Sequence, residues 1–186
     1  MAKLTIPHVR GREKAIFDKL GITLIESMEP EEFEAMMIDF LSNHNVLHLA
    51  TCKNNVPRCT PLEYFNVGLD VHVFSEGGGK IVNIKNNPLV SFGISDPFDP
   101  LEDFFASTGL QVWGTASIFR KNDAPEKFQE LRSHTVYGKH PEKIREQGIS
   151  GVDSDINFHI ITIRPTRMRY FNLRKGSMNI TWKRDE

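Results

Sequence analysis

Residues 69–94 have the sequence LDVHVFSEGGGKIVNIKNNPLVSFGI, and this stretch decides most of the fold prediction. Val71, Val73 and the aromatic residue after them give its start the character of a β-strand. Ser75 and the glycines that follow break the strand, and a short helix is expected from Lys80 to the Asn-Pro pair. A further strand follows the proline. The stretch therefore predicts a strand, a glycine loop, a helix and a second strand in series.

The glycine loop has the features of a phosphate-binding turn. Gly77, Gly78 and Gly79 allow positive φ angles and let the backbone approach a ligand closely. Lys80 follows where the first N–H groups of the helix have no partner within the helix. Free amides, the positive end of a helix dipole and an ammonium group together favour an anion. The alternative is a flexible surface turn that precedes a helix.

Two common nucleotide-binding motifs are absent from this loop. The P-loop pattern GxxxxGK[ST] is missing, because Ile81 stands where a serine or threonine would bind magnesium. The dinucleotide fingerprint GxGxxG cannot be written here, and the flanking elements are not repeated βαβ units. The expected ligand is phosphorylated, but it is neither a nucleoside triphosphate nor a dinucleotide.

The bulk composition indicates one soluble domain over residues 1–186. The chain is 39% hydrophobic and 25% charged, which is typical of globular proteins. Its formal net charge of −1 gives no reason to expect a nucleic-acid partner. We expect no membrane span and no signal peptide, and therefore a cytoplasmic protein. Cys52 and Cys59 are the only cysteines and are expected to be free thiols.

Hydrophobic periodicity places the regular elements. A helix is expected over about 30–43, because apolar residues recur there every three or four positions. Strands are expected at 46–51, 58–67, 69–74, 89–94, 110–119 and 158–170, and a second long helix at 123–137. Bends are expected at Gly114 and at Pro165.

Two segments are expected to be irregular. The segment 96–108 contains two prolines among acidic residues and is expected to be a long loop. It carries Phe98, Phe104 and Phe105, and is a candidate cover for a binding site. The segment from Arg174 onward is expected to be a polar tail.

The strands follow one another in hairpin order, and the helices are inserted between them rather than alternating with them. This order favours a mainly β (α+β) fold, a mostly antiparallel barrel with peripheral helices. A doubly wound α/β sheet is the alternative. The expected organisation is an N-terminal helical extension over 1–44, a barrel over 45–172 and a C-terminal tail over 173–186.

The order of these elements resembles the FMN-binding split-barrel flavoproteins of the pyridoxamine 5′-phosphate oxidase-like superfamily. The resemblance covers roughly Phe33 to Tyr170 and depends on three fragments in the right order. They are LHLATCKNNVPRCTPLEYF at 47–65, VHVFSEGGGKIVNIKNNPLVSF at 71–92 and LQVWGTASIF at 110–119. The resemblance implies a six-stranded antiparallel split β-barrel that forms a homodimer, with FMN in a cleft at the subunit interface.

The resemblance also implies a set of cofactor-binding residues. Lys80 and the amides of Gly78 and Gly79 would hold the FMN phosphate, Ser75 would face the ribityl chain, and the segment 58–62 would run beneath the isoalloxazine ring. The full set is Arg58, Cys59, Thr60, Pro61, Leu62, Phe74, Ser75, Gly78, Gly79, Lys80, Gln111 and Trp182.

Some of these residues have simpler interpretations. Arg58 is alternatively a solvated charge, and Thr60 an ordinary strand residue. Gln111 depends on a strand register that a shift of one residue would invert. Trp182 is alternatively part of an exposed, frayed end.

The resemblance implies an FMN-dependent oxidoreductase that acts on a small-molecule substrate or an electron-transfer partner, with no catalytic residue assigned. Gly79 stands where the oxidases that make pyridoxal phosphate carry an arginine, so vitamin B6 oxidation is not expected. The alternatives are a non-enzymatic flavin carrier or sensor, and a haem-binding or deazaflavin-binding member of the same fold. Among the histidines, His48, His72 and His159 lie on expected strands without metal-ligand spacing, so no metal is expected.

Overall fold

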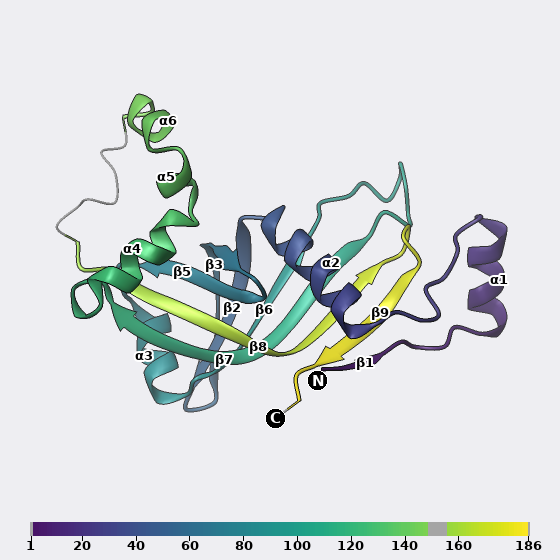
Figure 1. Cartoon of the computed structure of the whole chain (residues 1–186). Coiled ribbons are helices and arrows are strands. Elements are labelled where there is room, and N and C mark those ends of the chain that lie inside the picture. Colours follow the sequence, from purple (N-terminus) through teal and green to yellow (C-terminus); the bar gives the residue numbers. More distant parts are fainter. Residues whose placement is uncertain (1, 149–155, 186) are drawn as a thin grey trace.

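A forked antiparallel sheet forms the body of the computed structural model, which describes residues 2–148 and 156–185 (Figure 1). Within these residues nine strands are present, with the order β1-β9-β8-β7-β6-β2-β3 and a β4–β5 hairpin attached to β8. The strands are β1 (Lys3–Thr5), β2 (Val46–Lys53), β3 (Val56–Glu63), β4 (Phe65–Val67), β5 (Asp70–Ser75), β6 (Leu89–Ser95), β7 (Thr108–Arg120), β8 (His159–Asn172) and β9 (Ser177–Lys183).

The long strand β8 produces the fork. Its first half pairs with β5, from Val71 opposite Ile163 to Ser75 opposite His159, while its second half pairs with β9. β3 pairs only with β2, and it approaches β5 without a ladder of hydrogen bonds. The sheet is therefore an open, antiparallel split barrel, as predicted, but it has nine strands within the described residues where six were expected.

Helices lie around the sheet rather than between its strands (Figure 1). They are α1 (Gly11–Lys19), α2 (Pro30–Ser42), α3 (Gly79–Asn86), α4 (Pro125–Ser133), α5 (Val136–Lys139) and α6 (Pro141–Glu146). Helix α2 begins with a capping box between Glu29 and Glu32 and packs its apolar face on the barrel. In the described part of the chain, no helix has the length and apolar character needed to cross a bilayer.

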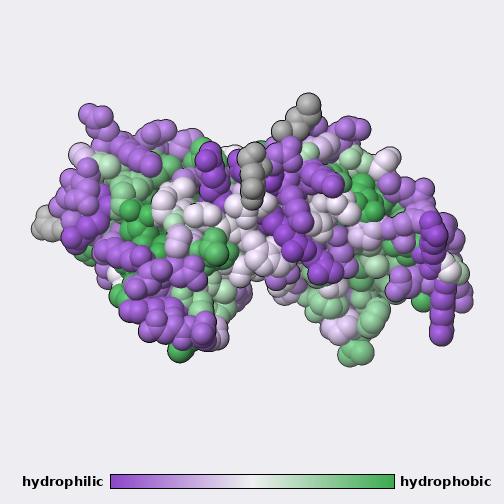
Figure 2. All heavy atoms as spheres, turned by 90° about the horizontal axis from the view of Figure 1, so that it is seen from below, coloured by the Kyte–Doolittle hydropathy of each residue, from purple (hydrophilic) through white to green (hydrophobic). Residues whose placement is uncertain are grey.

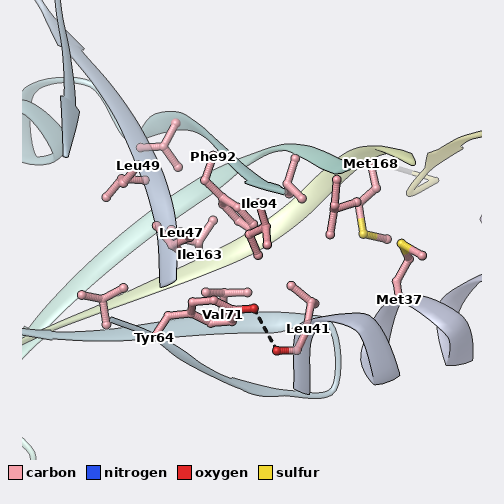
Figure 3. Close-up of a cluster of buried hydrophobic side chains, with 14 of the residues drawn as sticks. Met37, Leu41, Leu47, Leu49, Tyr64, Val71, Phe92, Ile94, Ile163 and Met168 are labelled. Atoms are coloured by element: carbon pink, nitrogen blue, oxygen red, sulfur yellow. Dashed lines mark hydrogen bonds between the residues drawn. The ribbon is translucent and has the colours of Figure 1, made fainter. Parts of the chain in front are cut away.

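The core fills the space between α2 and the inner face of the sheet (Figure 3). The inward residues alternate along each strand, as a half-buried sheet requires. Leu47 and Leu49 on β2, for example, are fully buried. The Tyr64 hydroxyl donates a 2.8 Å hydrogen bond to the Leu41 carbonyl, which ties the β3–β4 junction to the end of α2.

The strand expected at 58–67 is divided in two at Tyr64. The Tyr64 N–H donates a 2.9 Å hydrogen bond to the carbonyl of Asn45, the residue before β2. After Tyr64 the chain turns to pair with β5, where Phe65 lies opposite His72. The buried hydroxyl fixes this change of partner, which alternation in the sequence could not reveal.

The prediction of a polar tail after Arg174 is wrong. β9 pairs with β8 and also with the N-terminal strand β1, so both ends of the described chain join the sheet. Trp182 is 1% exposed, and its Nε1 donates a 2.8 Å hydrogen bond to Glu34 Oε1 on α2. Ile180 and Trp182 alternate with Thr181 and Lys183, a strand pattern that the surrounding polar residues obscured.

The bends expected in the two long strands are confirmed. The register between β7 and β8 shifts between Trp113 and Gly114, where Gly114 lies opposite Pro165. A Cβ at Gly114 would lie 2.5 Å from the Arg164 carbonyl oxygen, so only glycine permits this approach. The bulge follows from a proline that cannot donate to the ladder.

The helix expected over 123–137 ends earlier. α4 stops at Ser133, because the Thr135 hydroxyl donates to the Arg132 carbonyl at 2.7 Å and accepts from the Gly138 N–H at 3.1 Å. Thr135 is thus the N-cap of α5, and it redirects the chain. Phe128 and Leu131 of α4 pack on the outer side of β5 and β8 and form a second apolar cluster.

The segment 96–108 is a loop, as expected. In this chain Phe105 packs edge-on against Phe17 of α1, with ring centroids 5.9 Å apart. Asp103 accepts two 2.6 Å hydrogen bonds from Arg174. Phe104 remains 70% exposed. Figure 2 shows one face of the molecule, elongated and hollowed between two lobes, with separate apolar patches among polar side chains.

The second cluster contains a histidine whose protonation opposes folding. His72 is 5% exposed between β5 and α4, stacked on Phe65 with centroids 5.2 Å apart. Burial lowers the pKa of His72 to about 4. The folded state therefore binds this proton less well than the unfolded state. Its stability is complete above the ordinary histidine pKa near 6.5 and falls as the pH drops towards 4.

We expect the free energy of unfolding to fall by roughly 2–3 kcal/mol between pH 7 and pH 4.5 through His72 alone. His72→Gln keeps a polar group for the Thr162 hydroxyl, 3.1 Å from Nδ1, but does not titrate. Urea unfolding of the wild type, His72→Gln and the exposed-site control His48→Gln at both pH values isolates the effect. Equal losses in wild type and His72→Gln would contradict the prediction.

Candidate functional site

The glycine loop joins β5 to α3 and requires its first two glycines. Gly77 and Gly78 have φ angles of 139° and 95°, in the region that side chains strongly disfavour. Gly78 is the N-cap of α3, and Gly79 is its first residue. The N–H groups of Gly79 and Lys80 lie in the first turn, where a helix has no internal acceptor for them.

Side chains at both ends of the loop hold its shape. The Ser75 hydroxyl accepts a 3.1 Å hydrogen bond from the Gly77 N–H. Lys80 Nζ donates a 2.9 Å hydrogen bond to the Gly77 carbonyl. The loop therefore has a defined conformation held by its own residues, unlike a flexible turn.

Arg58 reaches this loop from β3. A Cβ added to Gly79 would lie 2.9 Å from Arg58 Nη1, so the guanidinium rests against the first residue of α3. Arg58 Nε also donates a 3.3 Å hydrogen bond to the Thr60 hydroxyl. Any larger residue at position 79 would displace Arg58. The third glycine therefore leaves room for the Arg58 guanidinium, and its φ angle does not demand glycine.

Two cations meet at the start of α3. Burial, and secondarily the charge of Arg58, lower the pKa of Lys80. Within residues 2–148 and 156–185, neither Arg58 nor Lys80 forms an ion pair with a carboxylate. Two like charges beside free amides repel one another unless an anion lies between them. The arrangement is suited to a phosphate group.

The other predicted residues of β3 are divided between the two faces of the strand, because side chains alternate along it. Thr60 and Leu62 lie on the same side as Arg58, while Cys59 and Pro61 point to the opposite side. Both cysteines are free thiols, and Cys59 is exposed. β3 is an edge strand, so its outer N–H and C=O groups have no strand partner within the described chain.

A cavity of about 430 Å³ lies at the other end of β3, between the sheet and α5. Phe74, the residue before the loop serine, forms part of its wall. Sequence reasoning missed its polar residues Glu63 and Tyr137. Burial, followed by the nearby Glu63 carboxylate, raises the pKa of the Tyr137 hydroxyl. They are 74 positions apart in the chain, so no local pattern could have joined them.

Gln111 lies in a separate, open hollow of about 450 Å³ on the outer face of the sheet. The strand register places His48, Gly93, Gln111 and Arg169 in one row across four strands. Arg169 Nε donates a 3.0 Å hydrogen bond to Asn179 Oδ1. No residue of the glycine loop lines this hollow in the same chain.

The structure thus brings together part of the predicted set. Arg58, Thr60, Ser75, Gly78, Gly79 and Lys80 lie together around the start of α3. Gln111 faces the outer hollow, and Trp182 is packed beneath α2. Arg169 escaped the sequence prediction, although the alternation of β8 places it on the side of Gln111.

Comparison with known proteins gave a consistent set of similarities. A family model described as pyridoxamine 5′-phosphate oxidase matches residues 33–172. A search of curated proteins by sequence gave no match. Each solved structure compared below is less than 25% identical to this chain, so the likeness concerns the fold.

A Listeria innocua protein provisionally described as a pyridoxamine 5′-phosphate oxidase is 24% identical, with a TM-score of 0.55 over 76% of this chain and 99% of that one. A conserved hypothetical protein from Mycobacterium tuberculosis is 21% identical, with a TM-score of 0.61 over 82% and 91%. A FAD-binding protein from Mesorhizobium loti is 17% identical, with a TM-score of 0.51 over 82% and 95%.

Proposed function

The chain belongs to the pyridoxamine 5′-phosphate oxidase family, and from this premise we propose that it is a flavoprotein that binds FMN. The observation that carries the proposal is the pair of cations, Arg58 and Lys80, at the glycine-rich start of α3. A terminal phosphate dianion placed there would receive charge-assisted hydrogen bonds from both side chains and from the loop amides. The Mesorhizobium loti neighbour, described as FAD-binding, supports a flavin on this fold.

The absent arginine in the loop agrees with this assignment. Gly79 leaves space for Arg58, so the second positive charge comes from β3 instead of from the loop itself. The anion site keeps two cations although its sequence pattern differs. This is why a departure from the oxidase motif does not argue against a bound phosphate.

The rest of the cofactor would extend along β3. From Arg58 to Glu63 the strand extends about 17 Å, at about 3.3 Å per residue. A ribityl chain and ring laid along this edge strand would reach the 430 Å³ cavity. The free backbone groups of the edge would face the ring. The cavity would then admit a small-molecule substrate beside the flavin, which makes the protein an oxidoreductase in which the cofactor supplies the redox chemistry.

A homodimer would complete the cofactor site. Within residues 2–148 and 156–185, the outer edge of β3 has no strand partner, and the polar row that contains Gln111 and Arg169 lines an open hollow. We therefore place the flavin where two copies meet, with Gln111 of one copy near the ring bound by the other. Sedimentation of the protein with FMN should give a dimer, and a monomer with full FMN affinity would contradict this part.

The absorption spectrum of the purified protein, with mass spectrometry of the released cofactor, tests the assignment. FMN gives flavin bands and one defined mass, whereas a Soret band or a deazaflavin mass would overturn it. If FMN is bound, addition of reduced pyridine nucleotide separates two functions. Bleaching of the flavin supports an oxidoreductase, and bound flavin that stays oxidised with every donor tried supports a carrier or sensor. The protein would act in the cytoplasm.

A further inference from the structure

The 430 Å³ cavity is lined by side chains of opposite charge that do not form an ion pair. Glu63 comes from β3 and Lys139 from α5, and both side chains are exposed. In the part of the chain that the structure describes, no ion pair joins these two side chains, and neither has another ion-pair partner. Opposite charges that share a cavity without pairing are available to a ligand that carries both signs.

The other titratable groups of the cavity do not remove this polarity. His44 Nδ1 lies 2.7 Å from the Phe40 carbonyl and its Nε2 lies 2.6 Å from Asp96 Oδ1, so both ring nitrogens are engaged. His140 Nδ1 lies 4.0 Å from Glu142 Oε1. The carboxylate that contacts the His44 ring, Asp96, lies outside the cavity lining.

Two further polar residues line the cavity. His134 is exposed. The Tyr137 hydroxyl forms a hydrogen bond with the Glu63 carboxylate. Glu63 is therefore the single carboxylate that lines the cavity in the described chain.

Part of the cavity lining is aromatic. Phe65 and Phe74 meet edge to face with centroids 5.3 Å apart, and Tyr64 lies beside them. Such a surface binds an apolar or aromatic group and also stabilises a nearby ammonium. The volume lies within the range of small-ligand sites.

We propose that this cavity binds a small zwitterion of the amino-acid class. Its ammonium group pairs with Glu63, its carboxylate pairs with Lys139, and its apolar side group lies on Phe65 and Phe74. As a statement about the substrate the inference rests on the proposed function, because we assigned this cavity to the small-molecule substrate beside the flavin. Binding of the zwitterion itself is tested separately, because none of these contacts involves the anion site at Lys80.

Three probes that differ in one charge each test the proposal. They are L-phenylalanine, phenethylamine, which lacks the carboxylate, and 3-phenylpropionate, which lacks the amine. Binding to the full chain is measured by calorimetry or ligand-observed NMR. We expect phenylalanine to bind best, and each single-charge probe to bind roughly tenfold more weakly.

Two substitutions complete the cycle, because each replaces one charged side chain with a neutral polar one. Glu63→Gln should weaken phenylalanine and phenethylamine roughly tenfold and leave phenylpropionate unchanged. Lys139→Gln should weaken phenylalanine and phenylpropionate and leave phenethylamine unchanged. Lys143→Gln, on α6 and outside the cavity lining, is the matched control and should change nothing.

Absence of binding by all three probes, or equal affinities that neither substitution alters, would overturn the proposal. Phenylpropionate binding that improves in Glu63→Gln and exceeds that of phenylalanine would show an anion site instead. An FMN titration of the same variants is a separate readout. The zwitterion site can therefore fail while the flavin assignment stands, and the reverse also holds.

Discussion

Trp182→Ala is expected to destabilise the fold by roughly 3–5 kcal/mol, the range for truncating a large buried aromatic residue. The side chain is 1% exposed and lies among the largest fully buried residues. Its removal leaves a cavity between α2 and β9 and also deprives Glu34 Oε1 of its 2.8 Å donor. Because a domain is stable by only about 5–15 kcal/mol, this loss approaches the whole margin.

Urea unfolding followed by circular dichroism measures the effect. Lys183→Ala is the control, because the neighbouring residue on β9 is exposed and should change stability by less than about 0.5 kcal/mol. Trp182→Phe should fall between the two, since it keeps most of the volume and loses the indole donor. A frayed C-terminal segment would instead make Trp182→Ala as mild as Lys183→Ala, which would contradict the packing of β9.

The strands and loops that were predicted correctly are those that their own residue types indicate. Val71 and Val73 enter the core from one face of β5, and the glycines after them adopt the φ angles that the loop prediction required. Local chemistry fixed these features, so they were visible in the sequence. The prediction of a polar tail failed because polar residues surround Ile180 and Trp182. A strand as short as β9 has too few buried residues for its alternation to be recognised.

The features that sequence reasoning missed arise from contacts between distant segments. Nothing near Glu63 indicates that Tyr137 will stand beside it, because α5 reaches the cavity only after Thr135 redirects the chain. The reason for Gly79 was hidden in the same way. Its hydrogen atom makes room for Arg58, a residue on a strand that enters the site from elsewhere in the sequence.

Lys80→Ala is expected to weaken FMN binding by roughly 1.5–3 kcal/mol, about 10- to 150-fold, through loss of a charge-assisted phosphate contact. The Lys80 ammonium donates a 2.9 Å hydrogen bond to the Gly77 carbonyl, which holds it at the loop. Arg58→Ala should weaken FMN similarly. The double variant should lose less than the sum, because the two charges repel each other in the absence of the phosphate.

Riboflavin separates the phosphate contact from every other effect, because it has the same ring and ribityl chain without the phosphate. Fluorescence titrations should show a loss of FMN affinity in Lys80→Ala and no change for riboflavin. Lys85→Ala, in the last turn of the same helix, should bind both ligands like the wild type. Burial and Arg58 lower the pKa of Lys80, so FMN affinity should begin to fall at a lower alkaline pH than an ordinary lysine would give. Equal losses for FMN and riboflavin in Lys80→Ala would place the phosphate away from this loop, since a contact with the phosphate alone cannot affect a ligand that lacks it.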